Sequence, residues 1–262
     1  MPAPRAITSA RNPVVQRFRD AAAGAVDGAM MAEGARLVAE ALDAGLGLLA
    51  AAVSPRCADG ALRARLQASA AEFYECSDEV MARLSALETA PGVAVLLQRP
   101  ATDEAAVLGR ALVPLVVVAA GVRDPGNLGS LLRTAEAVGA SGVLTMAGGA
   151  DPFRDKAVRG SMGSVFRLPT LHGYDAAAVV AFAERHRLQL VVADGAGERA
   201  YSEVDLRRPT ALVVGGEAHG VPPELLRAAA VRVRIPLCAP VESLNVAVAA
   251  GVLLFEAARQ RR

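Results

Sequence analysis

The sequence offers little material for metal sites or disulfide frameworks. Its three cysteines and three histidines are scattered along the chain, and no CxxC pair occurs. Structural zinc sites and disulfide scaffolds need such side chains at short, regular spacings. We therefore expect neither a metal site nor a disulfide framework.

Long hydrophobic runs are missing as well. The longest, residues 111–122 and 246–255, are well short of the roughly 20 residues that a membrane-crossing helix needs, and Pro114 interrupts the first. The N-terminal residues do not show the charged and then apolar pattern of a secretory signal. We predict no membrane span and a cytoplasmic location.

Excess charge of either sign is also absent. The 28 basic and 27 acidic residues leave a formal net charge of only +1. Such a chain has no overall electrostatic attraction to nucleic acid, so a nucleic-acid partner must be held by local basic patches. Lys156 is the only lysine, and its surroundings exclude a GK[ST] phosphate loop.

Hydrophobic residues are abundant, because they make up 53% of the 262 positions. This is enough for the cores of one large or two ordinary domains. From residue 112 onward, apolar β-branched runs alternate with helical patterns. Strands are predicted at 113–119, 142–146, 188–194, 210–216 and 231–237. Helices are predicted at 127–139, 174–187, 221–230 and 243–262. This alternation predicts an α/β fold with a mostly parallel sheet covered on both faces.

The first hundred residues alternate on a smaller scale. Helices are predicted at 12–24, 34–45, 59–72 and 77–88. Strands are predicted at 48–54, 72–77 and 92–99. The stretch 99–110 is polar at its start and separates the two halves. We therefore predict a smaller α/β domain over residues 1–108 and a larger domain over residues 112–262.

Residues 123–140, RDPGNLGSLLRTAEAVGA, combine a polar turn with a helix that carries a single cation. Apolar side chains recur there at helical spacing and predict one buried face. Asn127 occupies the expected N-cap position. Arg133 lies off the buried face, and its side chain can lean back toward the helix start past Gly129, which has no side chain. The guanidinium, the backbone N–H groups and the helix dipole would then converge on an anionic group.

The same residues have a plainer interpretation. Asn127 can be a helix cap and nothing more. Arg133 can be an exposed side chain that pairs with Glu136 one turn away. One helix of this kind does not decide between the two interpretations.

Two further stretches favour a joint site. LVVGGEAHGVP (212–222) places Glu217 directly after a buried strand, and IPLCAPVESLNVAVAAG (235–251) places Ser243 and Asn245 at the mouth of an apolar helix. Each is also compatible with ordinary turn and cap geometry. Because α/β sheets bind ligands at the carboxyl ends of parallel strands, three such loops together indicate one shared site.

These three stretches resemble the motifs of the SpoU/TrmH branch of the SPOUT RNA methyltransferases. Asn127, Gly129 and Arg133 resemble its first motif, GGEAHG its second and IPLCAPVESLNVAVAAG its third, and residues 156–169 are similar to its middle segment. The N-terminal sequences ITSARNPVVQRFRD and MAEGARLVAEAL are similar to the L30e-like RNA-binding domain that often precedes the catalytic domain. One position departs from the pattern, because the family often has asparagine where this chain has Gly216.

The resemblance implies a fold and a reaction. The fold is a SPOUT-type parallel sheet with a C-terminal trefoil knot, preceded by a smaller L30e-like α/β domain, and it works as a homodimer. The reaction transfers a methyl group from S-adenosylmethionine to a ribose 2′-hydroxyl of RNA. Ribosomal RNA, 23S rRNA first, is favoured over tRNA because the smaller tRNA enzymes often lack the N-terminal domain. A non-catalytic RNA-binding or ribosome-assembly protein of the same fold is the alternative, although it would be expected to have lost Arg133 or Asn245.

The resemblance also assigns the site residues. Arg133 is the expected catalytic arginine. A guanidinium is nearly always protonated, so we expect it to stabilise developing negative charge and to anchor a phosphate, and proton acceptance by it stays open. The residues expected to position ribose, arginine and cofactor are Asn127, Glu217, Ser243 and Asn245. The residues expected to bind S-adenosylmethionine are Gly215, Ile235 and Leu244.

Local basic patches would hold the RNA. One cluster of cations lies in the middle segment, and a second lies in the arginine-rich N-terminal stretch. The predicted contacts are Arg154, Lys156, Arg159 and Arg11. A solvated charged face is the alternative interpretation of both clusters.

Overall fold

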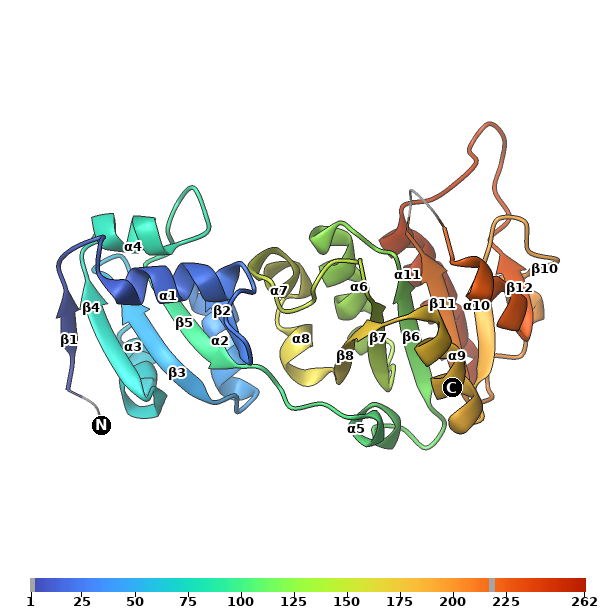
Figure 1. Ribbon diagram of the computed structural model, residues 1–262, viewed down its shortest axis with the longest axis horizontal. Helices are drawn as coiled ribbons and strands as arrows, with labels where there is room; N and C mark the ends of the chain where they lie inside the picture. The colour runs from blue at the N-terminus through green and yellow to red at the C-terminus, as the bar shows by residue number, and fades with distance from the viewer. Residues whose placement is uncertain (1–2, 217–219) are drawn as a thin grey trace. The chain divides into compact units, whose positions relative to one another are not determined.

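The computed structural model describes residues 3–216 and 220–262, so Glu217 of the second motif lies outside the described residues. The chain forms two compact units (Figure 1). The first contains the residues up to Ala101 together with Phe153–Arg167, and the second contains Thr102–Pro152 and Leu168–Arg262. The chain therefore passes from one unit to the other three times.

The first unit is a mixed sheet with six helices among its described residues. Its strands are β1 (Arg5–Ile7), β2 (Ala29–Glu33), β3 (Leu48–Val53), β4 (Glu72–Cys76) and β5 (Val93–Gln98), in the order β1-β4-β3-β5-β2. Its helices are α1 (Pro13–Ala22), α2 (Ala35–Asp43), α3 (Gly60–Ser69), α4 (Asp78–Leu84), α7 (Asp155–Ser161) and α8 (Ser164–Arg167). Strand β4 runs parallel to β1 and β3, whereas β5 runs antiparallel to β3 and β2.

All seven helices and strands predicted for the first hundred residues are present, but β1 and β2 were not predicted. Strand β2 reads AMMAE and is buried at all five residues. It therefore shows neither the alternation of a half-buried strand nor the β-branched residues of a typical one.

The segment Phe153–Arg167 belongs to the first unit, although it follows a strand of the second along the chain. Helix α7 packs against β2, and Arg159 forms ion pairs with Glu33 of β2 at 3.3 Å and with Asp155. The segment also buries the apolar side chains Phe153, Val158, Val165 and Phe166. The predicted division at residues 108–112 did not include this excursion, because it depends on contacts between residues far apart in sequence.

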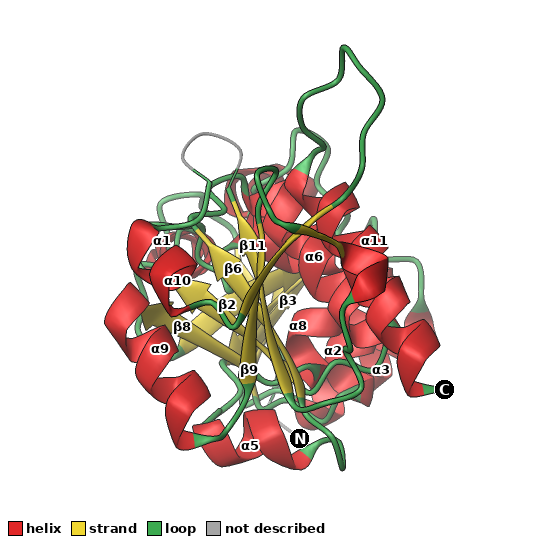
Figure 2. Cartoon of the chain, turned by 90° about the vertical axis from the view of Figure 1, so that its right-hand side faces the viewer, coloured by secondary structure: helices red, strands yellow, loops and turns green. Residues whose placement is uncertain are grey.

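The second unit is a seven-stranded sheet in which the described strand pairs are all parallel. Its strands are β6 (Leu115–Ala120), β7 (Gly142–Met146), β8 (Thr170–Tyr174), β9 (Gln189–Ala193), β10 (Arg199–Ala200), β11 (Thr210–Gly215) and β12 (Val231–Arg234), in the order β10-β12-β9-β11-β6-β7-β8. Its helices are α5 (Glu104–Gly109), α6 (Pro125–Ala137), α9 (Ala176–Arg185), α10 (Pro223–Ala228), α11 (Val246–Arg261) and the short 3-10 helix η1 (Tyr201–Glu203). Figure 2 shows α9 and α10 on one side of this sheet and α6 and α11 on the other. The predicted α/β fold with a parallel sheet is confirmed.

Burial explains which strands the sequence reveals. Strand β6, with the sequence LVVVAA, is buried at all six residues, as expected for a central parallel strand. The predicted strand at 231–237 ends at Arg234, because Pro236 has no N–H to donate to a neighbouring strand. Strand β8 lies at the sheet edge and is mostly not buried, so it lacks a hydrophobic pattern.

The C-terminal knot stays a prediction.

No helix within the described residues is long and apolar enough to cross a membrane. Likewise, no group of three His, Cys, Asp or Glu side chains within residues 3–216 and 220–262 is arranged to hold a metal ion.

Candidate active site

Three loops meet at one edge of the sheet in the second unit. Strands β6 and β11 pair in parallel, with Ala120 opposite Gly215 at their carboxyl ends. Strand β9 is parallel to both β11 and β12. The loops after β6, β11 and β12, which contain the three motifs, therefore leave the sheet at the same edge, where parallel sheets bind ligands.

Helix α6 begins at Pro125, two residues before the first motif's asparagine. Asp124 is the N-cap, and its Oδ1 accepts a hydrogen bond of 2.8 Å from the backbone N–H of Asn127. Pro125 takes the first helical position, where the helix needs no donor. The predicted N-cap at Asn127 is therefore wrong. Since Asn127 does not cap the helix, its side-chain amide can serve the site.

The amides of Asn127 and Asn245 join the first motif to the third. Asn245 caps α11, because its Oδ1 accepts from the backbone N–H groups of Ala247 at 2.9 Å and Val248 at 3.4 Å. Its Nδ2 donates a hydrogen bond of 3.0 Å to Oδ1 of Asn127. Two side chains that lie 118 residues apart are thus fixed against each other at the starts of two helices.

Arg133 lies on the exposed face of α6, whereas Leu131 and Leu132 are buried. Glu136, the partner considered from the sequence, forms an ion pair of 3.9 Å with Arg110. In the described part of the chain, no hydrogen bond or ion pair involves Arg133. The plainer interpretation of Arg133 as a partner of Glu136 is therefore wrong.

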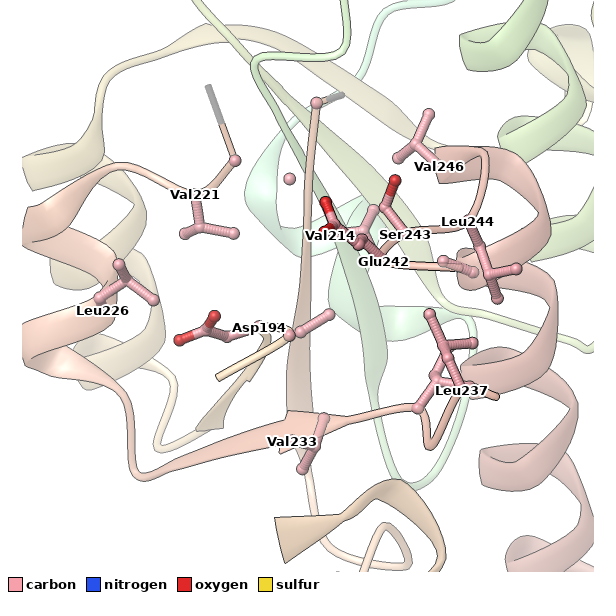
Figure 3. Close-up of a pocket in the computed structure, with 17 residues that line it drawn as sticks. Asp194, Val214, Val221, Leu226, Val233, Leu237, Glu242, Ser243, Leu244 and Val246 are labelled. Carbon is pink, nitrogen blue, oxygen red and sulfur yellow. The ribbon is translucent and has the colours of Figure 1, made fainter. Parts of the chain in front are cut away.

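A cavity of about 430 Å³ lies beside the motif loops (Figure 3). Gly215, Ile235 and Leu244, the three residues predicted to bind a cofactor, all line it, and so does Ser243. Much of the remaining described wall is apolar, from Val214, Val221, Leu226, Val233 and Leu237. Such a size and lining are typical of a small-molecule site.

A smaller cavity of about 100 Å³ adjoins the larger one. Asn127 and Arg123 line it, and Gly216 and Val246 line both cavities. Asn127 therefore lies in the wall of the smaller cavity, and its partner Asn245 directly precedes Val246, which lines both. Arg133 does not line the described wall of either cavity.

The glycines between the cavities are required by close backbone packing. A Cβ at Gly215 would lie 2.6 Å from the carbonyl carbon of Gly220, and a Cβ at Gly216 would overlap the carbonyl oxygen of Gly121. The N–H of Gly216 also donates to the carbonyl of Ala120 at 2.8 Å. An asparagine at residue 216 would need this loop to move.

Two carboxylates of the larger cavity were missed in the sequence. Asp194 follows β9 at the same sheet edge, and Glu242 precedes Ser243 in the third motif. A search of every strand end for polar side chains would have found Asp194. Glu242 gives no comparable signal, because it lies in a long loop.

The predicted RNA-binding residues lie in the first unit. Arg154, Lys156 and Arg11 are exposed, whereas Arg159 is partly buried between the two carboxylates that it binds. Burial raises the pKa of the Glu33 carboxyl above its ordinary range, although a hydrogen bond from Ser85 and the charge of Arg159 act in the opposite direction. Arg159 therefore holds α7 to β2 in this structure.

Comparisons with known proteins agree with this geometry. Residues 114–255 match the SpoU rRNA Methylase family, and residues 17–95 match the MRM3-like substrate binding domain. An uncharacterized tRNA/rRNA methyltransferase of Synechocystis is 32% identical over 97% of this chain and 94% of its own length. The 23S rRNA (guanosine(2553)-2'-O)-methyltransferase of Bacillus subtilis is 31% identical over 70% of this chain and 71% of its own.

Solved structures are similar over nearly the whole chain. The AdoMet-bound rRNA methyltransferase from Sinorhizobium meliloti superposes with a TM-score of 0.84 at 32% identity, and covers 98% of each chain. The SpoU methyltransferase AviRb from Streptomyces viridochromogenes, also in complex with AdoMet, has a TM-score of 0.85 at 27% identity, with 96% of this chain and 98% of that one covered.

Proposed function

The chain belongs to the SpoU rRNA methylase family, and we propose that it transfers a methyl group from S-adenosylmethionine to a ribose 2′-hydroxyl of ribosomal RNA. The observation that carries this proposal is the hydrogen bond between Asn127 and Asn245. It holds the first and third motifs together beside the larger, mostly apolar cavity and the smaller one, whose wall includes Arg123, Asp124 and Asn127. A donor site and an acceptor site need this adjacency, because methyl transfer requires the two reacting atoms to be in contact.

The larger cavity fits S-adenosylmethionine. Its volume of about 430 Å³ is suitable for a ligand of this size, and its apolar wall suits an adenine ring. Gly215, Ile235 and Leu244 would hold the ligand through backbone and apolar contacts. Side chains at Gly215 and Gly216 would collide with neighbouring backbone, so glycine at these positions lets the loops that line the cavity pack closely. When bound, the cofactor supplies an electrophilic methyl group on a positively charged sulfur.

The polar residues of the site would act on the ribose. A sugar hydroxyl is a weak nucleophile, so the protein has to orient it and stabilise the negative charge that develops on its oxygen. We assign orientation to Asn127, Asn245 and Ser243, and charge stabilisation to the guanidinium of Arg133. The resemblance also assigns a positioning role to Glu217. That residue lies outside the described part of the chain.

The first unit would bind the RNA. Its match to the MRM3-like substrate binding domain supports this role, and Bacillus and Streptomyces relatives are named as 23S rRNA 2'-O-methyltransferases. We propose that exposed Arg11, Arg154 and Lys156 contact phosphates. Arg159 is the weakest of the predicted contacts, because its guanidinium is already bound by two carboxylates. A cytoplasmic location stays a prediction.

We also propose a homodimer formed through α11. The apolar side chains of Val248 and Phe255 lie two turns apart on this helix and are 53% and 56% exposed. Such a stripe on a helix that is otherwise packed against α6 and β11 suits a protein partner. Asn245 caps the start of the same helix, so a second copy on this face would lie close to the site.

The reaction can be tested with the purified protein. It is incubated with tritium-labelled S-adenosylmethionine and unmodified transcripts of 23S rRNA, 16S rRNA and tRNA, and the digested RNA is analysed by mass spectrometry. We expect a 2′-O-methylated nucleoside from 23S rRNA. Label that enters only tRNA would mean that the substrate is tRNA and not ribosomal RNA. Label on a base would refute ribose methylation.

Arg133→Ala tests the assignment of charge stabilisation. Arg133 is exposed and has no partner among the described residues, so the variant should fold like the wild type. We expect methylation to fall by at least about a hundredfold, while calorimetry shows unchanged affinity for S-adenosylmethionine. Turnover close to that of the wild type would remove Arg133 from the mechanism.

A further inference from the structure

The larger cavity is acidic. Asp194 and Glu242 contribute carboxylates to its wall, and none of the described residues that line it is Lys, Arg or His. Figure 3 draws the two carboxylates at separate places, Asp194 on the side of Leu226 and Glu242 next to Ser243. A ligand in this cavity therefore faces negative side chains without a positive one in the described wall.

Neither carboxylate is neutralised by a cation of its own. Arg232 lies 3.6 Å from Asp194, but the same guanidinium also binds Glu198, so one positive charge is shared by two negative ones. Glu242 is exposed, and within the described residues it forms no hydrogen bond or ion pair. The wall of the cavity thus keeps a net negative charge.

Glu242 lies next to Ser243 on the third-motif side of the cavity, which is the side on which the proposed function places the reaction. It belongs to the third motif, whose Asn245 binds Asn127 of the smaller cavity. Gly216 and Val246 line both cavities, so the reacting atoms meet on this side. Asp194 lies on another part of the wall, after β9.

We propose that Glu242 makes the cavity prefer the methyl donor to its spent product because of their different charge. The inference rests on the proposed function. Donor and product share the adenosine and the amino-acid group, and they differ only at sulfur, which is a cationic sulfonium in the donor and a neutral thioether in the product. During transfer the methyl carbon bonds to the ribose oxygen, the hydroxyl proton passes to solvent water, and the electron pair of the broken S–C bond stays on sulfur.

This preference has a consequence for turnover. A carboxylate near the sulfur attracts the donor and loses that attraction once the methyl group has left. The spent product then leaves more easily and fresh donor replaces it. We assign Asp194 to the adenosine, which donor and product share, because a carboxylate can accept hydrogen bonds from its sugar hydroxyls.

Calorimetry with three ligands tests the proposal. The ligands are S-adenosylmethionine, S-adenosylhomocysteine and sinefungin, which has a cationic amine in place of the sulfonium. We expect the wild type to bind both cations more tightly than S-adenosylhomocysteine. Glu242→Gln should reduce this preference by roughly threefold to tenfold, whereas Asp194→Asn should weaken all three ligands by a similar factor. Glu224→Gln, an exposed carboxylate of α10 outside the described cavity wall, should change none.

The outcomes separate this proposal from the proposed function. If Glu242→Gln keeps the wild-type preference, the role of Glu242 is refuted while methyl-donor binding stands. Glu242→Lys gives a second check, because a cation at this position should favour the neutral product; donor preference retained in this variant would also refute the role. If the folded wild type binds none of the three ligands, the proposed function itself fails.

Discussion

At the scale of single residues, Asn245 uses one amide for two tasks. Its Oδ1 caps α11, and its Nδ2 donates to Asn127. An aspartate at this position would keep the cap, because its oxygen accepts the same backbone N–H groups, but it would have no N–H for Asn127. An alanine would lose both interactions. These two substitutions therefore separate the stability of the helix from the geometry of the site.

We expect Asn245→Asp to change the free energy of unfolding by less than about 0.5 kcal/mol, yet to lower methylation strongly. Asn245→Ala should lower methylation and also reduce the free energy of unfolding by about 0.5–2 kcal/mol. Urea denaturation and the methylation assay measure the two effects on the same preparations. Full activity of Asn245→Asp would mean that the bond to Asn127 is dispensable.

At the scale of helices and strands, one carboxylate ties α5 to the end of α9. Arg185 Nη1 donates to both oxygens of Glu104, at 2.9 and 2.8 Å, and His186 Nε2 lies 2.7 Å from Oε2. Tyr174 adds a longer hydrogen bond of 3.3 Å. The contact with His186, together with Arg185 and Tyr174, holds the pKa of Glu104 below its ordinary value of 4.5.

This lowered pKa fixes the direction of a pH effect. Because the folded protein releases the Glu104 proton more readily than the unfolded chain, the contacts stabilise the fold above pH 4.5. The stabilisation is lost as the pH falls from 4.5 through the lowered folded pKa. Glu104→Gln should reduce the free energy of unfolding at neutral pH by about 0.5–1 kcal/mol. Thermal unfolding of both proteins across this range should show the difference shrink in acid, and a constant difference would contradict the argument.

The exposed stripe of α11 gives a prediction about assembly. Phe255→Asp places a charge in the proposed dimer interface, where burying it without a partner is unfavourable. We expect light scattering after gel filtration to give the dimer mass for the wild type and the monomer mass for this variant. Leu112→Asp is the matched control, because Leu112 is another exposed apolar residue but lies outside α11. A dimeric Phe255→Asp protein would place the interface elsewhere.

The start of α6 shows why strands and helices were easier to predict than the site. Burial restricts residue type over a whole element, as in β6 and β11, so the pattern is visible in the sequence. A cap is decided by one residue, and Asp124 and Asn127 are equally suitable. Pro125 at the first helical position was the deciding signal. The bond between Asn127 and Asn245 joins residues far apart in sequence, and no local pattern records it.

At the scale of the whole molecule, the division into units limits what can be cut out of the chain. A fragment of residues 102–262 would contain the second unit but would carry Phe153–Arg167 without β2 and α2. The segment would then expose apolar side chains that are buried in the intact protein, among them Phe153, Val158, Val165 and Phe166. Exposed, unsupported segments are the preferred sites of proteolysis.

We therefore expect a protease to cut this fragment within residues 153–167 under conditions that leave the same segment intact in the full chain. Mass spectrometry of the products after short digestion locates the cuts. The loop between β12 and α11, residues 235–245, belongs to the second unit in both proteins and serves as an internal reference. A segment equally resistant in fragment and full chain would show that it does not depend on the first unit.

The membership of Phe153–Arg167 could not be predicted from local sequence. Its helical residues and its buried side chains fit either unit equally well, because periodicity reports that a face is buried but not what covers it. What decides is the pairing of Arg159 with Glu33, which lies 126 residues earlier. Contacts of such sequence separation are fixed only when the chain folds.

The position of Phe153–Arg167 in the chain also determines when the first unit can be completed during synthesis. Domains usually fold one after another as the nascent chain leaves the ribosome. Here the N-terminal unit cannot finish in that way, since α7 and α8 are translated only after β6, α6 and β7. Until then β2 lacks the helix that packs against it and Glu33 lacks its cation, so the first unit is completed only after the first strands of the second unit have been made.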